Sequence, residues 1–508
     1  MVGIDIIYEV LSPKMITVMI ITSLYGLFIG TMPGLTATMA AALLVPFAFW
    51  LDPLTALAMI IVMDVLAIWA GDVPATFVRI PGTPASAAYT DDMYELTKGG
   101  KGQIALSISL LASTFGGLIG VLILIFFSPQ LARFAVNFSS SEFFWLVIFG
   151  LVSSILAVRG PPIKRVVSVL LGLLIALVGF DPVFYSSRLT FNIPELEGGL
   201  SYIPILIGVF GMSEVIRRVY YKARGITITL PYTEFKTLEL TVTGFSTLGK
   251  YFTRFITGSL IGTIIGALPG AGADIAAWLS YNISYRFSKN KDVYGKGSEE
   301  GLVAASSANN ASLAGAWIPS LVFGIPGDSV TAIVLGVMMM KGIIPGPKIF
   351  IEQGRLVTGL FIVFMIANLL IIPLGILTIK ALGRLFLKTP DYILVPSILL
   401  FCIVGSYAVD FTFFNVVVMI LFGIIGFFMQ RYGFPTPPMI LGIILGKILE
   451  TYFVMTYMKG GVIAFFNRPL SLILIALIIF IILAPKLSKI IISKRYEYKS
   501  PVTDTSNK

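Results

Sequence analysis

Histidine is absent from the 508 residues of this chain, and cysteine occurs once, as Cys402. The chain therefore lacks the commonest general base and the commonest ligand of transition metals. A single cysteine also excludes an intrachain disulfide and a thiolate metal cage. Any proton transfer has to rely on carboxylates, and any bound cation would be a hard ion held by oxygen atoms.

Charged residues are scarce as well, at 12% against 57% hydrophobic residues, and the mean hydropathy is +0.94. A soluble domain carries about 25% charged residues. Apolar runs of the length that spans a bilayer recur between Met15 and Leu483, which predicts an all-α polytopic membrane protein with roughly 10 to 12 transmembrane segments. The first run, residues 15–30, continues into more membrane sequence and is interpreted as a helix, not a cleaved signal peptide. The net charge of +10 reflects basic loops and not nucleic-acid binding.

An internal repeat is the strongest feature of the sequence. Residues 26–43 read GLFIGTMPGLTATMAAAL and residues 262–279 read GTIIGALPGAGADIAAWL, with an offset of 269 − 33 = 236. Residues 79–87 read RIPGTPASA and residues 324–332 read GIPGDSVTA, with an offset of 326 − 81 = 245. Two motifs in the same order, each centred on Pro-Gly, indicate a duplicated unit.

The repeat divides the chain into four regions: transmembrane repeat 1 (1–220), a cytoplasmic basic connector (221–252), transmembrane repeat 2 (253–458), and a final helix with a basic tail (459–508). Basic residues around Arg217 and after Leu483 place the connector and the C-terminus in the cytoplasm, with the chain in the inner membrane. The charges of the loops make the corresponding helices 143–158 and 393–408 run in opposite directions. The sequence therefore predicts repeats of inverted topology.

Four Pro-Gly pairs interrupt the apolar runs: Met32-Pro33-Gly34, Ile80-Pro81-Gly82, Leu268-Pro269-Gly270 and Ile325-Pro326-Gly327. Proline breaks a helix and glycine permits an unwound turn. The freed backbone groups must be buried in protein or line a wet cavity. Short helices that start after each break would direct their positive ends at one central site, which suits an anionic substrate. A single break could be an ordinary kink, but four in corresponding pairs favour a site.

The candidate substrate-binding residues are those of the breaks and the polar side chains beside them: Pro33, Gly34, Thr36, Thr38, Arg79, Pro81, Gly82, Thr83, Ser86, Pro269, Gly270, Gly272, Asn309, Asn310, Pro326, Gly327, Ser329 and Thr331. Hydroxyls and amides suit carboxylate oxygens or a desolvated Na⁺, and an arginine can hold a carboxylate by two hydrogen bonds. Asp72, Asp274 and Asp328 are the candidates for coupling a cation. Two alternatives stay open: Asp72 could neutralise Arg79, and Asp328 could cap a helix that starts at Ser329.

Several stretches together resemble the large membrane subunit of the tripartite tricarboxylate transporter family: GTMPGLTATMAAALLVPFAFWLDP (30–53), RIPGTPASAA (79–88), GALPGAGADIAAWLSY (266–281) and YGKGSEEGLVAASSANNASLAGAWIPSLVFGIPG (294–327). The resemblance implies a permease that works with a small four-helix membrane subunit and a periplasmic or other extracytoplasmic solute-binding protein. It implies uptake of a tricarboxylate or another small organic anion, driven by a Na⁺ or H⁺ gradient. No cofactor other than that ion is implied.

Three other readings of the chain compete with this one: a passive organic-anion channel, a non-transporting membrane scaffold, and an intramembrane enzyme acting on lipid. The enzyme is disfavoured because the chain lacks histidine, an activated nucleophile and a phosphate loop of the G-x-x-x-x-G-K-[ST] kind. The sequence therefore predicts a secondary transporter and not an enzyme.

Overall fold

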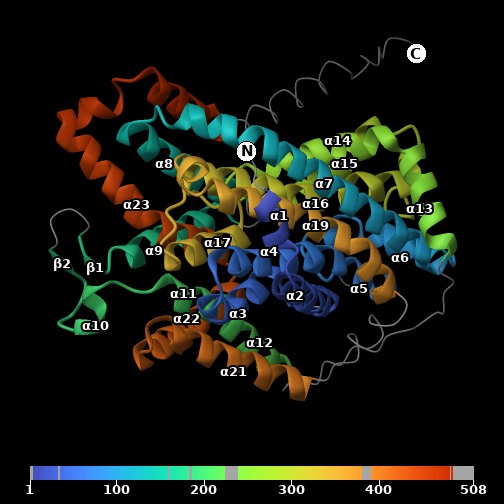
Figure 1. Cartoon of the computed structure of the whole chain (residues 1–508), viewed down its shortest axis with the longest axis horizontal. Coiled ribbons are helices and arrows are strands. Elements are labelled where there is room, and N and C mark those ends of the chain that lie inside the picture. The colour runs from blue at the N-terminus through green and yellow to red at the C-terminus, as the bar shows by residue number, and fades with distance from the viewer. Residues whose placement is uncertain are drawn as a thin grey trace, which may run out of the picture.

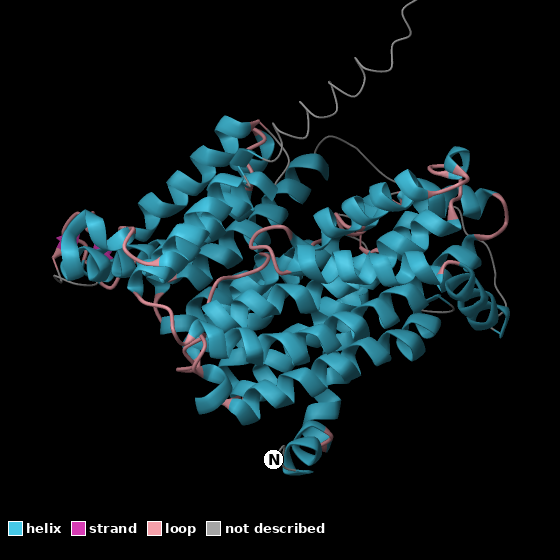
Figure 2. Cartoon of the chain, turned by 90° about the horizontal axis from the view of Figure 1, so that it is seen from above, coloured by secondary structure: helices cyan, strands magenta, loops and turns pink. Residues whose placement is uncertain are grey.

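The computed structural model describes residues 4–32, 35–79, 81–157, 161–181, 186–222, 238–379, 391–480 and 482–483. Helices make up nearly all of its secondary structure (Figure 2), and the short strands β1 (Gly179–Phe180) and β2 (Ser187–Arg188) form one antiparallel pair. The prediction of an all-α protein is confirmed. Pro33, Gly34, residues 223–237 of the predicted connector and the predicted tail from residue 484 onward lie outside the described residues.

Six helical segments of the described chain are long and apolar enough to cross a membrane: α2 (Pro13–Thr31), Pro53–Phe77, α7 (Gly102–Ala135), α19 (Gly354–Leu377), α22 (Phe413–Arg431) and Thr436–Phe465. The second comprises α4 (Pro53–Ala70) and most of α5 (Asp72–Val78), and the last contains α23 (Thr436–Gly460). Shorter apolar helices accompany them, among them α3 (Ala37–Trp50), α8 (Ser140–Ala157), α14 (Phe252–Gly266), α17 (Ser329–Met340) and the helix Pro469–Phe480. The chain is a multi-pass membrane protein, and short helices beside long ones are typical of interrupted passages.

Two further helices are long, the buried α16 (Glu299–Phe323) and α21 (Asp391–Asp410). The remaining described helices are shorter: α1 (Ile4–Val10), α6 (Thr90–Lys98), α9 (Pro162–Ala176), α10 (Pro194–Glu197), α11 (Tyr202–Leu206), α12 (Ser213–Lys222), α13 (Leu238–Lys250), α15 (Gly272–Phe287) and α18 (Ile349–Glu352). Figure 1 shows the β1–β2 pair and α10 at one end of the long axis, α6 and α13 at the other, and α4 near the middle. Every residue of α4 from Leu54 to Ala70 is buried, so this span is surrounded by protein.

Two helix pairs, one from each half of the chain, pack through glycines. A β-carbon placed on Gly30 of α2 would lie 2.1 Å from the carbonyl oxygen of Ala67 on α4, and one on Gly266 of α14 would lie 2.1 Å from that of Ser312 on α16. Small residues at such contacts let transmembrane helices approach closely. The residue numbers differ by 236 for the glycines and by 245 for the carbonyls (266 − 30 and 312 − 67), the two offsets of the sequence repeat. The two pairs therefore pack in the same register.

The Pro-Gly breaks also pack alike in the two halves. A β-carbon on Gly82 would lie 2.6 Å from the α-carbon of Gly71, and one on Gly327 would lie 2.5 Å from that of Ala316, again with an offset of 245. In each half, the break thus lies against the end of the helix that precedes it in the core. Gly82 and Gly327 are required because another backbone segment lies too close for a β-carbon, whatever the backbone angles of the two glycines.

Candidate functional site

A cavity of about 520 Å³ lies where the breaks of both halves meet. Its wall is formed by the start of α3, the middle of α4, the break before η1 (Ser86–Ala88), the starts of α15 and α17, α12, and the start of α23. The polar and charged lining residues are Thr36, Thr38, Asp64, Thr83, Glu214, Arg217, Asp274, Asp328, Ser329, Gln430 and Thr436. The cavity therefore carries many polar and charged side chains although most of the chain around it is apolar.

Among the described residues, four helices of twelve residues or more begin at the wall of this cavity: α3, α15, α17 and α23, of which the first three follow Pro-Gly breaks. The Thr36 hydroxyl accepts a hydrogen bond from the backbone N–H of Met39 (3.1 Å), and the Asp328 carboxylate accepts one from that of Thr331 (2.8 Å). Helix N-termini carry partial positive charge and free N–H groups, which favour anions. Of the four breaks, three are thus followed by a helix that starts at the cavity, while at Pro81-Gly82 the residues Thr83 to Ala85 line the cavity before the short η1.

Glycine is needed at the start of α15 because the backbone there is left-handed. Gly270 has a φ of 80° and Gly272 a φ of 65°, which residues with a β-carbon rarely adopt. The N–H of Gly270 donates to the carbonyl oxygen of Gly327 at 2.7 Å. This bond joins the two breaks of the second half and holds the starts of α15 and α17 side by side at the cavity.

The charges at the wall are mostly negative. Four carboxylates, those of Asp64, Glu214, Asp274 and Asp328, line the cavity together with one guanidinium, that of Arg217. Four negative groups and one positive group give a formal charge of −3 when all are ionised. Arg217 binds Glu214 through two contacts, Nε to Oε2 at 2.6 Å and Nη2 to Oε1 at 2.8 Å. A guanidinium binds any carboxylate by the same two hydrogen bonds. A carboxylate of a ligand can therefore take the place of Glu214 on Arg217 and leave the guanidinium paired.

The structure brings some of the predicted residues into the wall and places others behind it. Those that line the cavity are Thr36, Thr38, Thr83, Gly270, Gly272, Asp274, Asp328 and Ser329. Those that pack behind the lining are Asp72, Pro81, Gly82, Ser86, Pro269, Asn309, Asn310, Pro326, Gly327 and Thr331. Of the alternatives left open, Asp328 does cap α17, through a capping box with Thr331.

Arg79 lies away from the cavity, contrary to the expectation from the sequence. It ends α5 in a left-handed conformation, with a φ of 57°. Its side chain is 54% exposed, and Nη2 lies 2.8 Å from Oδ1 of Asp91. The hydrogen bond to Asp91 raises the pKa of Arg79. The alternative in which Asp72 neutralises Arg79 is wrong, because the turn at the end of α5 directs the guanidinium to the surface and to Asp91.

Asp72 is fully buried and bound by uncharged donors. The Tyr89 hydroxyl donates to Oδ1 at 2.7 Å, and the Ser109 hydroxyl donates to Oδ2. The Tyr89 oxygen in turn accepts a hydrogen bond from Nδ2 of Asn309 at 3.0 Å. These contacts connect α5, α6, α7 and α16, so Asp72 joins four helices behind the cavity.

Asp64 was a functional candidate on sequence grounds, as the one charged residue in the apolar helix α4, but was assigned no role in the site. Sequence reasoning missed four polar lining residues: Glu214, Arg217, Gln430 and Thr436. They carry no such signal, since they lie at or beyond the ends of apolar runs and not within one.

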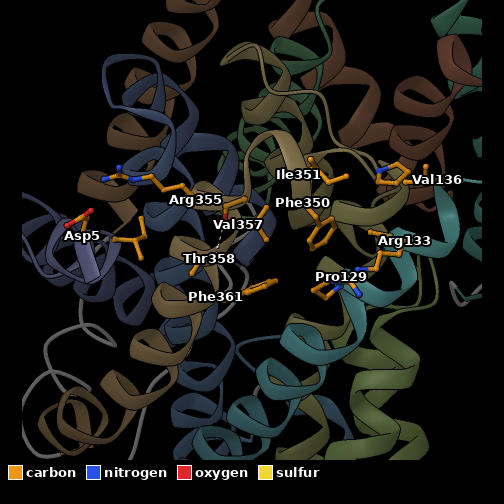
Figure 3. Close-up of a pocket in the computed structure, with 14 residues that line it drawn as sticks. Asp5, Pro129, Arg133, Val136, Phe350, Ile351, Arg355, Val357, Thr358 and Phe361 are labelled. Atoms are coloured by element: carbon orange, nitrogen blue, oxygen red, sulfur yellow. Dashed lines mark hydrogen bonds between the residues drawn. The ribbon is translucent and has the colours of Figure 1, made fainter. Parts of the chain in front are cut away.

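A separate cavity of about 570 Å³ lies between α1, the end of α7, α18 and the start of α19. In Figure 3, Asp5 and Arg355 lie on one side of it and Arg133 and Val136 on the other. Arg355 contacts Glu9 of α1, with Nη2 2.7 Å from Oε2. None of the candidate residues lines this cavity, so it is not part of the candidate site.

A multi-pass helical protein whose broken helices converge on a polar cavity has the architecture of a membrane transport protein. The family model of the "Tripartite tricarboxylate transporter TctA family" matches residues 16–441, and the chain belongs to that family. It is therefore a membrane component of a transporter family.

Two curated relatives come from Agrobacterium vitis. The chain is 31% identical over 475 residues to an "Uncharacterized 52.8 kDa protein in TAR-I ttuC' 3'region", covering 92% of each chain. It is 35% identical over 208 residues to an "Uncharacterized protein in TAR-II ttuC' 3'region", covering 41% of this chain and 86% of the relative. No solved structure matches the chain.

Proposed function

We propose that this chain is the permease subunit of a binding-protein-dependent secondary transporter that imports a small organic anion together with Na⁺ or H⁺. The observation that carries the proposal is that the three helices following Pro-Gly breaks, α3 from the first half and α15 and α17 from the second, begin at one cavity that carries polar and charged side chains. Membership of the family supports the permease role. The partners are then a small four-helix membrane subunit and an extracytoplasmic solute-binding protein, and the substrate is a tricarboxylate or another carboxylate.

The charge of the cavity supports coupling to a cation. With four carboxylates and one guanidinium at its wall, an organic anion that enters meets a net negative field. Two like charges about 4 Å apart repel by about 4 kcal/mol at the effective dielectric constant of a protein surface. Cations or protons that neutralise the wall remove this repulsion, so the anion binds tightly only when they are present. The two ligands then move together.

Within the cavity, hydroxyls and helix starts are the groups we assign to the anion. Thr36, Thr38 and Thr83 offer hydroxyls beside backbone N–H groups. Arg217 supplies a positive charge once a substrate carboxylate replaces Glu214. Asp274 and Asp328 are the predicted cation-coupling residues that lie at the same wall. The glycines and prolines of the breaks position these groups, and Gly270 and Gly272 lie at the wall themselves.

The matched packing of the two halves supports alternating access by inverted repeats. Thr38 and Asp274 are equivalent by the first offset, and Thr83 and Asp328 by the second, and all four line the cavity. The helices α4 and α16 also touch at equivalent residues, where Nδ2 of Asn310 donates to the carbonyl oxygen of Val65 at 3.3 Å (310 − 65 = 245). Equivalent residues meet at an axis of internal symmetry. A cavity on such an axis is the place where a carrier binds its solute.

The orientation follows from the basic residues near the cavity. Arg217 lines it, and Arg431 directly follows the lining residue Gln430. Because cytoplasmic loops are enriched in Lys and Arg, we assign this side of the cavity to the cytoplasm. The chain then lies in the inner membrane with a cytoplasmic C-terminus.

Uptake of labelled di- and tricarboxylates into proteoliposomes tests the proposal. The liposomes contain this chain with its small membrane partner and its binding protein, with and without a Na⁺ or proton gradient. Accumulation above equilibrium that collapses with the gradient is the expected result. Equilibration without accumulation would identify a channel, and the absence of flux for every carboxylate would refute the transport function.

A matched pair of variants locates the substrate site. Thr38→Val removes a hydroxyl at the cavity, and Thr257→Val removes one on the exposed face of α14. A hydrogen bond to a charged group contributes about 1.5–3 kcal/mol, so Thr38→Val should raise KM by about 10-fold or more. Thr257→Val should leave KM unchanged. Equal KM values for both variants would place the substrate elsewhere.

A further inference from the structure

Three buried side-chain oxygens at the crossing of α4 and α16 have no hydrogen-bond donor among the described residues. They are Oδ1 of Asp64, Oδ1 of Asn309 and Oδ1 of Asn310, on residues that are 5%, 0% and 1% exposed. The crossing itself is fixed by the hydrogen bond from Asn310 to the Val65 carbonyl oxygen. Asp64 and Asn309 occupy equivalent positions on the two helices (309 − 64 = 245). Asp64 is the neighbour of Val65 on α4 and Asn309 that of Asn310 on α16, so the three orphaned oxygens belong to residues at or beside this contact.

Buried oxygens without a partner are costly, and a buried carboxylate without one is more costly still. The amide nitrogens of Asn309 and Asn310 already donate, to Tyr89 and Val65, which fixes both amides with their oxygens left over. Asp64 lies in an apolar helix with no other charged residue. The atoms without a partner in these three residues are therefore all oxygens, and one of them belongs to a carboxylate. Such a set needs a positively charged group or hydrogen-bond donors.

The geometry points to a Na⁺ site at this crossing, with Asp64 as the charged ligand and the amide oxygens of Asn309 and Asn310 as neutral ligands. Hard cations take carboxylate and amide oxygens of this kind. A proton on Asp64 would satisfy the carboxylate but leave both amide oxygens unpartnered, whereas a metal cation satisfies all three. The binding of Na⁺ at this site does not depend on the proposed function. Only its role as the coupling ion of transport rests on that function.

The site links the ion to the substrate cavity because Asp64 belongs to both. Asp64 lines the cavity, while the two asparagines lie behind its wall. A bound Na⁺ therefore removes one negative charge from the wall without occupying the space of the anion. Asp72 is a poorer ligand, since both of its oxygens already accept hydrogen bonds from hydroxyls.

Thermal unfolding of the purified full-length chain tests the site without a substrate. The probe is NaCl, titrated against choline chloride at constant ionic strength. A ligand that binds only the folded state raises its stability with concentration. We expect a Na⁺-specific rise in Tm in the wild type, and a midpoint of that rise shifted at least 10-fold higher in Asp64→Asn and in Asn310→Ala. Asp292→Asn, in an exposed turn, should match the wild type.

Either of two results would overturn the site: equal stabilisation of the wild type by choline and Na⁺, or a wild-type Na⁺ response in both Asp64→Asn and Asn310→Ala. Should Asp64→Asn fail to fold, Asn310→Ala decides alone. The site and the proposed function fail separately. Carboxylate accumulation driven by a proton gradient without Na⁺ would keep the permease and refute this site, whereas Na⁺-specific stabilisation without any transport would keep the site and refute the permease.

Discussion

The glycine contacts between α2 and α4 and between α14 and α16 make the matched packing of the two halves testable. Replacing Gly30 or Gly266 by alanine adds one methyl group to each contact. That β-carbon would lie 2.1 Å from a backbone carbonyl oxygen in both cases, far inside van der Waals distance. Neither carbonyl can rotate away, because each belongs to a helix, so the helices must separate.

The expected magnitude follows from two opposing effects. Alanine is favoured over glycine inside a helix by about 0.5–1 kcal/mol. Overpacking a close contact costs about 1–3 kcal/mol. The net destabilisation should be about 1–2 kcal/mol for either variant, and equal for the two because the distances are equal. Gly249, at the exposed end of α13, has no atom within 4 Å of an added β-carbon, so Gly249→Ala should stabilise the protein slightly or leave it unchanged.

Denaturation by SDS in mixed micelles, followed by tryptophan fluorescence, measures the three variants against the wild type. The order of stability should be Gly249→Ala at or above the wild type, with Gly30→Ala and Gly266→Ala together below it. If Gly30→Ala and Gly266→Ala proved as stable as Gly249→Ala, the helices would not approach as described. A large effect of one and none of the other would refute the equivalence of the two pairs.

Further variants test the cavity and its supports. Arg217→Gln removes the guanidinium that binds Glu214 and makes the cavity more negative, so we expect KM for carboxylate uptake to rise about 10-fold or more, by a factor that becomes smaller at higher ionic strength. Asp72→Asn places an amide donor against a hydroxyl donor and should lower the free energy of unfolding by about 1–3 kcal/mol in SDS denaturation, with little change in KM. Burial raises the pKa of Asp92 despite hydrogen bonds that lower it. Its folded pKa exceeds the unfolded value of about 3.9, so stability falls as pH rises from about 4 through the folded pKa, and Asp92→Asn should remove that slope from Tm measured against pH.

The parts of the site that the sequence predicted depend on local chemistry and on the repeat. Proline and glycine mark the breaks because their backbone limits apply wherever they occur. A polar residue just after a break then falls at a helix start, as Thr36, Thr38 and Ser329 do. The repeat predicted that the breaks would lie together, since two breaks that match in sequence must face the same region if the halves pack alike.

The parts that the sequence did not predict depend on contacts between distant segments. Arg79 was expected at the site because it precedes a break, but its left-handed backbone turns it toward Asp91, and no pattern announces that turn. Arg217 was expected beside the cytoplasmic connector, at the end of repeat 1. Only the packing of α12 against α22 and α21 brings it to the cavity wall. Asp72 finds its partners 17 and 37 residues further along the chain, which charge patterns near Arg79 could not indicate.

The two halves share a backbone but divide the chemistry of the cavity between them. At equivalent positions, repeat 1 contributes hydroxyls, Thr38 and Thr83, where repeat 2 contributes carboxylates, Asp274 and Asp328. An anion therefore gains most from the first half and a cation from the second, apart from Asp64 at the crossing. When both ligands are bound, the anion held by the first half and the cation held by the second half attract each other across the cavity. With only one ligand bound, this attraction is absent. Under the proposed function, this division is what makes the loaded and the empty carrier able to reorient while a half-loaded one is held back.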